Sequence, residues 1–227
     1  MNICIPTLIL GQVEITESWW STIEKGGTVG YIIVGLSLLA LSLSVMHFVQ
    51  IRRSALLPEE QLAILETMLA NGRTQEALEY CVDPYNDSYL TRILATGLLR
   101  YQRSAFGPFE LKSSLEEAGE EQTSRLFRST DAIGLIGTIA PLLGLLGTVL
   151  GMVGAFKTLG TAGANTNAAL AGNISEALVT TMLGLVLAIP CVALFSYFRN
   201  RIEGLSSEAS SEIERLVLHL EETQGTK

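Results

Sequence analysis

Charged residues are scarce in this 227-residue sequence: Asp, Glu, Lys and Arg make up 17% of it, where about a quarter is usual for a globular protein. Its two histidines, His47 and His219, are too few for a His-rich metal site, and its three cysteines form no CxxC pair that could hold zinc. Acidic residues outnumber basic ones 23 to 15, and the net charge of −8 argues against a nucleic-acid-binding protein, which normally carries a basic stripe. We therefore expect no metal, no other cofactor and no nucleic-acid partner.

The shortage of charge falls in three apolar runs, each long enough to cross a membrane as a helix. About 20 mostly apolar residues span a hydrocarbon core of ~30 Å. Residues 29–51 and 132–156 contain no charged side chain, and residues 174–198 contain only Glu176. Runs of this length without alternation are helices, because an open strand cannot satisfy its backbone in lipid. The expected fold class is an all-α integral membrane protein with three transmembrane helices.

The first 28 residues (1–28) are expected to form an arm outside the membrane. The apolar run at 3–10 contains Pro6 and lacks a basic region before it, so it is a poor signal peptide. Trp19 and Trp20 lie just before the first span, and indole rings favour the interface between membrane and water.

Lysine and arginine are distributed unevenly around the three spans. Only Lys25 lies in the arm and only Lys157 lies in the 157–173 connection, while every other basic residue lies in 52–131 or 199–227. Basic residues favour the cytoplasmic side of a membrane. The N-terminus and the 157–173 loop are therefore expected in the periplasm, and the middle region and the C-terminal tail in the cytoplasm.

The middle region, residues 52–131, is expected to be a helical cytoplasmic insert. Pro58 and Thr74 open two short helical runs, and Asp87 is placed to cap a third. The insert contains no P-loop, GxSxG, HExxH or Rossmann fingerprint. We therefore expect a scaffold rather than an enzyme.

The second and third transmembrane helices are expected to extend far beyond the membrane. No strong helix breaker separates Gly107-Pro108 from the second span, and the stretch between them keeps roughly the helical period. An apolar stripe likewise continues past Arg199 into the tail at 199–227. The alternative is that both extensions are separate surface helices.

The second span carries six glycines on one stripe of a helix. They are Gly134, Gly137, Gly144, Gly147, Gly151 and Gly154. Small residues let helices approach closely in lipid, where no hydrophobic force drives them together. The stripe therefore predicts a packing face, within one chain or between chains. Thr148 lies beside it, and its hydroxyl either serves a polar path or bonds a carbonyl one turn earlier in its own helix.

The third span contains Glu176, the only acid in any span. An ionised residue inside a membrane is costly and commonly marks a functional path. The alternative is local, because Asn173 and Glu176 have the spacing of a capping box at a helix start. Helical geometry places Thr180 about 40° and Thr181 about 140° from Glu176 around the axis, so the two threonines do not share its face. Since the spans are antiparallel, Thr148, Glu176 and Thr181 are expected at a similar depth.

Two stretches of these spans resemble a known family. APLLGLLGTVLGM at 140–152 and ISEALVTTMLGLVLAIP at 174–190 strongly resemble the MotA/TolQ/ExbB proton-channel family, in order and in separation. GGTVGYIIVGLSLLAL at 26–41 is similar to ExbB more loosely. The three-span layout is similar to the ExbB and TolQ branch rather than to the four-span MotA stator.

The resemblance implies a homopentamer in the bacterial inner membrane whose second and third helices line a pore. That pore would hold the membrane helices of an ExbD- or TolR-like dimer, which brings an ionisable Asp. Proton flow would then energise outer-membrane transport through a TonB-like protein, or envelope processes through the Tol system. By position, the pore-lining residues are Thr148, Glu176 and Thr181, with Thr180 as the alternative to Thr181.

We interpret the chain as a proton-channel subunit of a membrane motor. A non-conducting scaffold subunit is the alternative. An intramembrane enzyme lacks support, because the spans contain no Ser/His pair, no HExxH and no paired aspartates.

Overall fold

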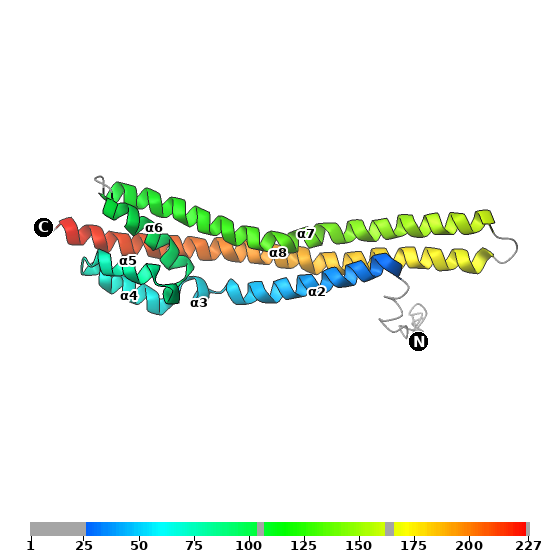
Figure 1. The fold of residues 1–227 in the computed structure, drawn as a ribbon, viewed down its shortest axis with the longest axis horizontal. Coiled ribbons are helices and arrows are strands. Elements are labelled where there is room, and N and C mark those ends of the chain that lie inside the picture. The colour runs from blue at the N-terminus through cyan, green and yellow to red at the C-terminus, as the bar shows by residue number, and fades with distance from the viewer. Residues whose placement is uncertain (1–25, 104–106, 162–165, 226–227) are drawn as a thin grey trace, which may run out of the picture. The chain divides into compact units, whose positions relative to one another are not determined.

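The computed structural model of the protein describes residues 26–103, 107–161 and 166–225, and this part of the chain is helical without a strand (Figure 1). The helices in chain order are α2 (Gly27–Gln50), α3 (Arg53–Leu56), α4 (Glu59–Ala70), α5 (Thr74–Val82), η1 (Pro84–Asn86), α6 (Tyr89–Arg103), α7 (Gly107–Thr161) and α8 (Thr166–Gly225). Trp19, Trp20 and the rest of the expected arm up to residue 25 lie outside the described residues.

Helices α2, α7 and α8 are long and apolar enough to cross a membrane. The expected fold class is confirmed, and so is the length of the second and third helices: α7 runs unbroken for 55 residues and α8 for 60. The alternative of separate surface helices is therefore wrong. Pro141 and Pro190 lie inside these helices without ending them, which lipid-embedded helices tolerate when neighbouring groups satisfy the freed carbonyls.

The segment 157–173 differs from its sequence-based description as a loop. Helix α7 continues to Thr161 and α8 begins at Thr166, so most of the segment is helical. Its alanines, such as Ala168, Ala169 and Ala171, are the best helix formers, and this propensity outweighs the glycines and polar residues among them.

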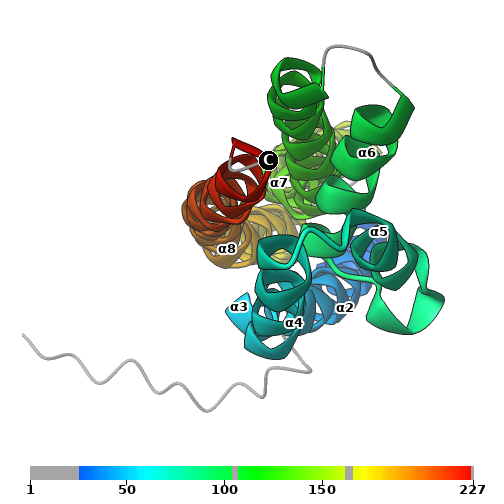
Figure 2. The same cartoon turned by 90° about the vertical axis from the view of Figure 1, so that its left-hand side faces the viewer.

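The chain forms two compact units, each of which contains parts of α2, α7 and α8. One unit contains the described residues among 39–137 and 189–225. In it the short helices α3 to α6 pack with α7 and α8, as Figure 2 shows from one end. Its core is aliphatic, and the largest fully buried side chains of α4 and α6 are Leu65, Leu69, Leu90, Ile93, Leu94 and Leu98. Leu99, which follows Leu98 in α6, is exposed.

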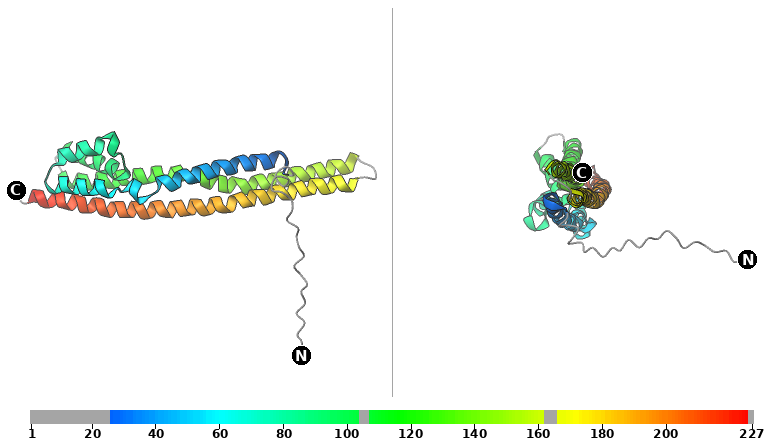
Figure 3. Two further views of the ribbon diagram at one scale, coloured as in Figure 1. Left: turned by 90° about the horizontal axis from the view of Figure 1, so that it is seen from below. Right: turned by 90° about the vertical axis from the view of Figure 1, so that its right-hand side faces the viewer.

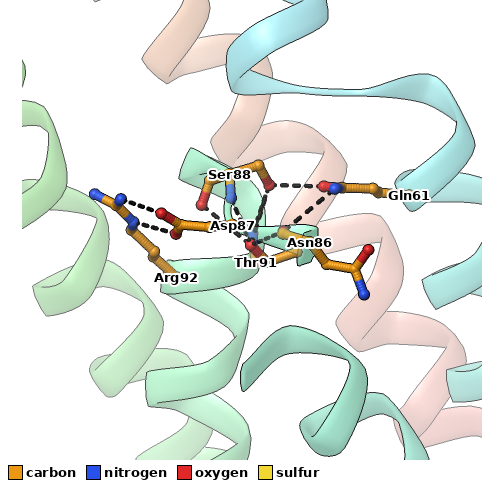
Figure 4. A network of polar contacts seen from close by, with 6 residues as sticks. All are labelled: Gln61, Asn86, Asp87, Ser88, Thr91 and Arg92. Carbon is orange, nitrogen blue, oxygen red and sulfur yellow. Dashed lines mark hydrogen bonds and ion pairs between the residues drawn. The ribbon is translucent and has the colours of Figure 1, made fainter. Parts of the chain in front are cut away.

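A polar network holds the start of α6 in this unit (Figure 4). The Ser88 backbone N–H donates to Thr91 Oγ1 (2.9 Å), and the Thr91 N–H donates back to Ser88 Oγ (3.2 Å), which is a reciprocal cap. Ser88 Oγ also donates to Gln61 Oε1 of α4 at 2.8 Å. The prediction that Asp87 caps this helix is wrong: Asp87 accepts two hydrogen bonds from Arg92 instead.

A second contact in the same unit ties α2 to α7 and α8. His47 is fully buried, its Nε2 lies 2.7 Å from the Ser129 carbonyl oxygen of α7, and its ring packs on Phe198 of α8. Further along, the Tyr89 hydroxyl lies 2.8 Å from Thr123 Oγ1 and 3.1 Å from Ser206 Oγ, which joins α6, α7 and α8.

The other unit contains the described residues among 26–38 and 138–188. Its three helical segments come from α2, α7 and α8, and α7 and α8 run antiparallel beside each other (Figures 1 and 3). Buried residues of this unit are small or aliphatic, among them Ile33, Ala140, Ala155 and Ala177, whereas Leu142, Leu145, Val149, Phe156 and Leu178 are exposed. Large apolar side chains facing outwards are typical of a surface that meets lipid or another protein.

Candidate functional site

The glycines of the second span lie against α8 of the same chain. A Cβ at Gly144 would come within 2.9 Å of the Thr181 Cα, and one at Gly151 within 2.7 Å of the Ala177 Cβ. A Cβ at Gly147 would overlap the Thr180 side chain. Gly154 faces the Asn173 side chain at an ordinary contact distance of 3.7 Å. Of the two possibilities left by the sequence, the structure therefore shows close packing within one chain.

Helix α8 contributes a glycine of its own to this contact. A Cβ at Gly184 would lie 2.5 Å from the Ala140 carbonyl oxygen of α7. Gly184 was not predicted to be a packing residue. The signal was present, because Thr180 and Gly184 form a small–xxx–small pattern on one helix face. Backbone meets backbone here, so neither helix offers a flexible side chain that could move aside.

The two adjacent threonines of α8 use their hydroxyls differently. Thr181 Oγ1 donates across the helix pair to the Gly144 carbonyl oxygen of α7 at 3.0 Å. Thr180 is buried, and its Oγ1 donates to the Ala177 carbonyl in its own helix at 2.8 Å, with the Gly144 carbonyl at 3.5 Å. Both hydroxyls keep lone pairs that can accept a further hydrogen bond.

Thr148 of α7 forms the local bond that the sequence offered as its alternative. Its Oγ1 donates to the Leu145 carbonyl one turn earlier at 2.6 Å. The side chain is half-buried and lies beside Gly147. The hydroxyl can still accept a hydrogen bond from outside the chain.

Glu176 lies at a pocket of about 300 Å³ between the three helical segments. The pocket is lined by residues of all three segments: Gly26, Thr28 and Val29, then Gly147, Leu150, Gly151 and Gly154, and finally Asn173, Glu176 and Thr180. The Glu176 carboxylate contacts Gly27 at the start of α2, and the side chain remains largely exposed. An acid, an amide and hydroxyls thus line one pocket of an otherwise apolar bundle.

The capping-box alternative for Glu176 is wrong. Because α8 begins at Thr166, Asn173 and Glu176 lie well inside the helix rather than at its start. Asn173 Nδ2 instead donates to Thr158 Oγ1 of α7 at 3.2 Å, and Thr158 Oγ1 donates to the Gly154 carbonyl at 2.9 Å. This polar link could not be expected from the sequence, because Thr158 and Asn173 fall in the 157–173 segment that was predicted to be a loop.

The structure brings Glu176 together with Thr180, as the helical wheel predicts. Thr181 and Thr148 do not line this pocket: one hydroxyl is turned to the Gly144 carbonyl and the other to its own helix. Among the described residues, no group of three His, Cys, Asp or Glu side chains could hold a metal ion.

The family of this protein can be identified from a sequence match that includes the α7–α8 pair. The model of the MotA/TolQ/ExbB proton channel family matches residues 85–211, which include α6, the whole of α7 and most of α8. The chain belongs to the MotA/TolQ/ExbB proton channel family. With this membership and its three long apolar helices, it is a membrane protein.

Several ExbB-named relatives are similar to this family member. A putative biopolymer transport protein ExbB-like 3 of Synechocystis is 34% identical over 47% of this chain and 53% of its own length. The biopolymer transport protein ExbB of Pseudomonas putida is 34% identical over 52% of this chain and 36% of its own length. A putative biopolymer transport protein ExbB homolog of Methanothermobacter thermautotrophicus is 28% identical over 79% of this chain and 62% of its own length. The chain thus spans about half the length of the first of these relatives.

Among solved structures, that of C. jejuni MotAB aligns with 90% of this chain and 89% of its own at 17% identity. The TM-score is 0.33, a likeness too loose to bear on how this family member assembles.

Proposed function

We propose that this chain is the proton-conducting subunit of an inner-membrane motor of the ExbB/TolQ type. The observation that carries the proposal is the position of Glu176. It is the only acid in the three spans, and its carboxylate lies at a polar pocket beside Thr180 rather than at a helix cap. Because the chain belongs to a proton channel family, we expect the Glu176 carboxylate to carry protons.

The residue types suit proton movement in different ways. A carboxylate can take up and release a proton, whereas a threonine hydroxyl only donates and accepts hydrogen bonds and so can hold a chain of waters. Thr181 and Thr148 keep accepting capacity on the α7–α8 pair and would face a pore formed with further copies. Each proton that crosses 100 mV makes about 2.3 kcal/mol available for mechanical work.

The assembly proposed here needs further chains. We expect a homopentamer around the membrane helices of an ExbD- or TolR-like dimer that supplies an Asp, with a TonB-like protein receiving the force. The N-terminus would lie in the periplasm and the C-terminus in the cytoplasm, as the distribution of basic residues favours. No catalytic role is proposed for any residue.

The test is proton influx into proteoliposomes that contain the complex with its single-span partner, driven by a membrane potential and read with a trapped pH dye. Glu176→Gln, Thr181→Val and Thr148→Val keep the side-chain shapes, and each should reduce influx at least tenfold without changing the assembly on a native gel. Ser37→Ala is the matched control, because Ser37 lies in the first span and its hydroxyl bonds only locally, to the Val34 carbonyl at 2.7 Å.

The scaffold alternative predicts a different result. If all three variants and the control conduct equally and assemble equally, the three side chains carry no protons and the channel proposal fails. A scaffold subunit would then account for the intact assembly.

A further inference from the structure

The first turn of α2 approaches the Glu176 carboxylate more closely than any residue with a side chain would allow. Gly27 has a φ of +53°, and a Cβ built on it would overlap Glu176 Oε1. Gly26, Thr28 and Val29 of the same turn line the Glu176 pocket. The start of the first membrane helix therefore forms one wall of the pocket, and at Gly27 it meets the carboxylate through backbone alone.

Two features of the structure favour glycine at position 27. The left-handed backbone conformation is open to glycine at little cost and is unfavourable for residues with a Cβ. A Cβ at this position would overlap the carboxylate of Glu176 and, because that side chain is exposed and flexible, would push the carboxylate out of its present place. Charge also suits the contact, because α2 has no acidic residue in its own first turn and a helix N-terminus favours a nearby negative charge.

We propose that Gly27 is a positioning residue for Glu176 and that the first turn of α2 forms part of the proton path. The proposal rests on the proposed function, since it assigns a role to Gly27 through the proton-carrying carboxylate. Helix α2 would then be more than an anchor: it sets where the Glu176 carboxylate lies relative to Thr180, which lines the same pocket one turn further along α8.

The test compares two glycines of the same helix. A Cβ at Gly35 would meet nothing within 4 Å, so Gly35→Ala is the matched control for Gly27→Ala. In the proteoliposome assay, Gly27→Ala should lower proton influx at least fivefold and Gly35→Ala less than twofold, with unchanged assembly on a native gel. Equal influx in the two variants, with Glu176→Gln inactive, would overturn this inference and leave the proposed function standing.

Backbone strain and collision with the carboxylate are separated by two further variants. Asn tolerates a positive φ better than Ala but still carries a Cβ, so Gly27→Asn should lose as much influx as Gly27→Ala. Glu176→Asp shortens the acid by one methylene, so the double variant Gly27→Ala/Glu176→Asp should conduct as well as Glu176→Asp alone. Recovery in Gly27→Asn, or no recovery in the double variant, would show that strain alone is responsible and would overturn the positioning role.

Full influx in Glu176→Gln would overturn both proposals, because a carboxylate that carries no proton needs no positioning.

Discussion

Gly184 of α8 and Ala140 of α7 meet through their backbones. A Cβ at position 184 would lie 2.5 Å from the Ala140 carbonyl oxygen and 3.3 Å from its carbonyl carbon. Real side chains do not approach a carbonyl oxygen this closely, so the helices would have to separate.

Gly184→Ala should therefore destabilise the protein, against the usual trend. Replacing glycine by alanine inside a helix normally gains up to about 1 kcal/mol, whereas overpacking costs about 1–3 kcal/mol. The cost of overpacking should exceed the gain in helix propensity, so thermal unfolding in detergent should show a lower midpoint. Gly172→Ala on the same helix is the control, because its Cβ would meet nothing within 4 Å, and it should unfold at the same temperature or higher. Equal midpoints would contradict the close contact.

Ser88→Ala should destabilise the unit that contains α6 by about 1 kcal/mol, the usual cost of losing an N-cap. The substitution removes the acceptor of the Thr91 N–H and the hydrogen bond to Gln61 (Figure 4). Thr91→Val should cost a comparable amount because it breaks the same reciprocal cap. If Ser88→Ala leaves the unfolding midpoint unchanged, the cap is not where the structure places it.

The ion pair of Asp87 and Arg92 should make stability depend on pH. Its hydrogen bonds from Arg92 lower the pKa of Asp87 below the ordinary value. A carboxylate with a lowered folded-state pKa contributes stability above its unfolded-state pKa, near 4, and loses that contribution as pH falls through the folded-state value. The side chains are half-exposed, at 48% for Asp87 and 50% for Arg92, so the gain is limited to about 0.2–1 kcal/mol.

Asp87→Asn should therefore unfold at a slightly lower temperature than the parent protein at pH 7, and the difference should shrink as pH falls below about 4. Arg92→Gln should give the same loss, and combining the two substitutions should add little, because both remove one interaction. Circular dichroism at several pH values measures this. A difference that persists unchanged at pH 3 would rule out the ion pair as its source.

Cys81 should resist alkylation in the folded protein. It is 6% exposed, and burial raises the pKa of its thiol to about 12. The thiolate is the reactive form, so at pH 8 labelling should be on the order of a thousandfold slower than for an unperturbed cysteine of pKa about 8.5. A Cys4→Ser/Cys191→Ser background isolates the thiol, and iodoacetamide labelling is followed by mass spectrometry before and after unfolding. Labelling within tenfold of the unfolded rate would show that Cys81 is accessible.

The sequence predicts those features that depend on composition along one helix. The absence of charge marks the spans, and the glycine spacing marks the face on which Gly144, Gly147 and Gly151 meet α8. The separation of Thr180 from Thr181 around the axis also follows from helical geometry, and the structure shows their hydroxyls bonded differently.

Features that depend on how helices cross could not be predicted. The contact of Gly27 with Glu176 joins residues far apart in the chain, and no local pattern encodes it. The capping-box spacing of Asn173 and Glu176 is a local pattern that the continuous helix overrides. Ser88 and Asp87 are equally good caps by residue type, and tertiary hydrogen bonds to Gln61 and Arg92 decide between them.

The bare backbone faces of α7 and α8 also restrict how this region can move. At Gly144, Gly151 and Gly184 the two helices lie so close that a slide or roll which brought a larger residue into the contact would cause a steric clash. A movement that keeps this contact intact would carry the two paired segments together. The outward side chains, such as Leu142 and Val149, are exposed instead, so they are free to change rotamer where a neighbouring molecule passes them.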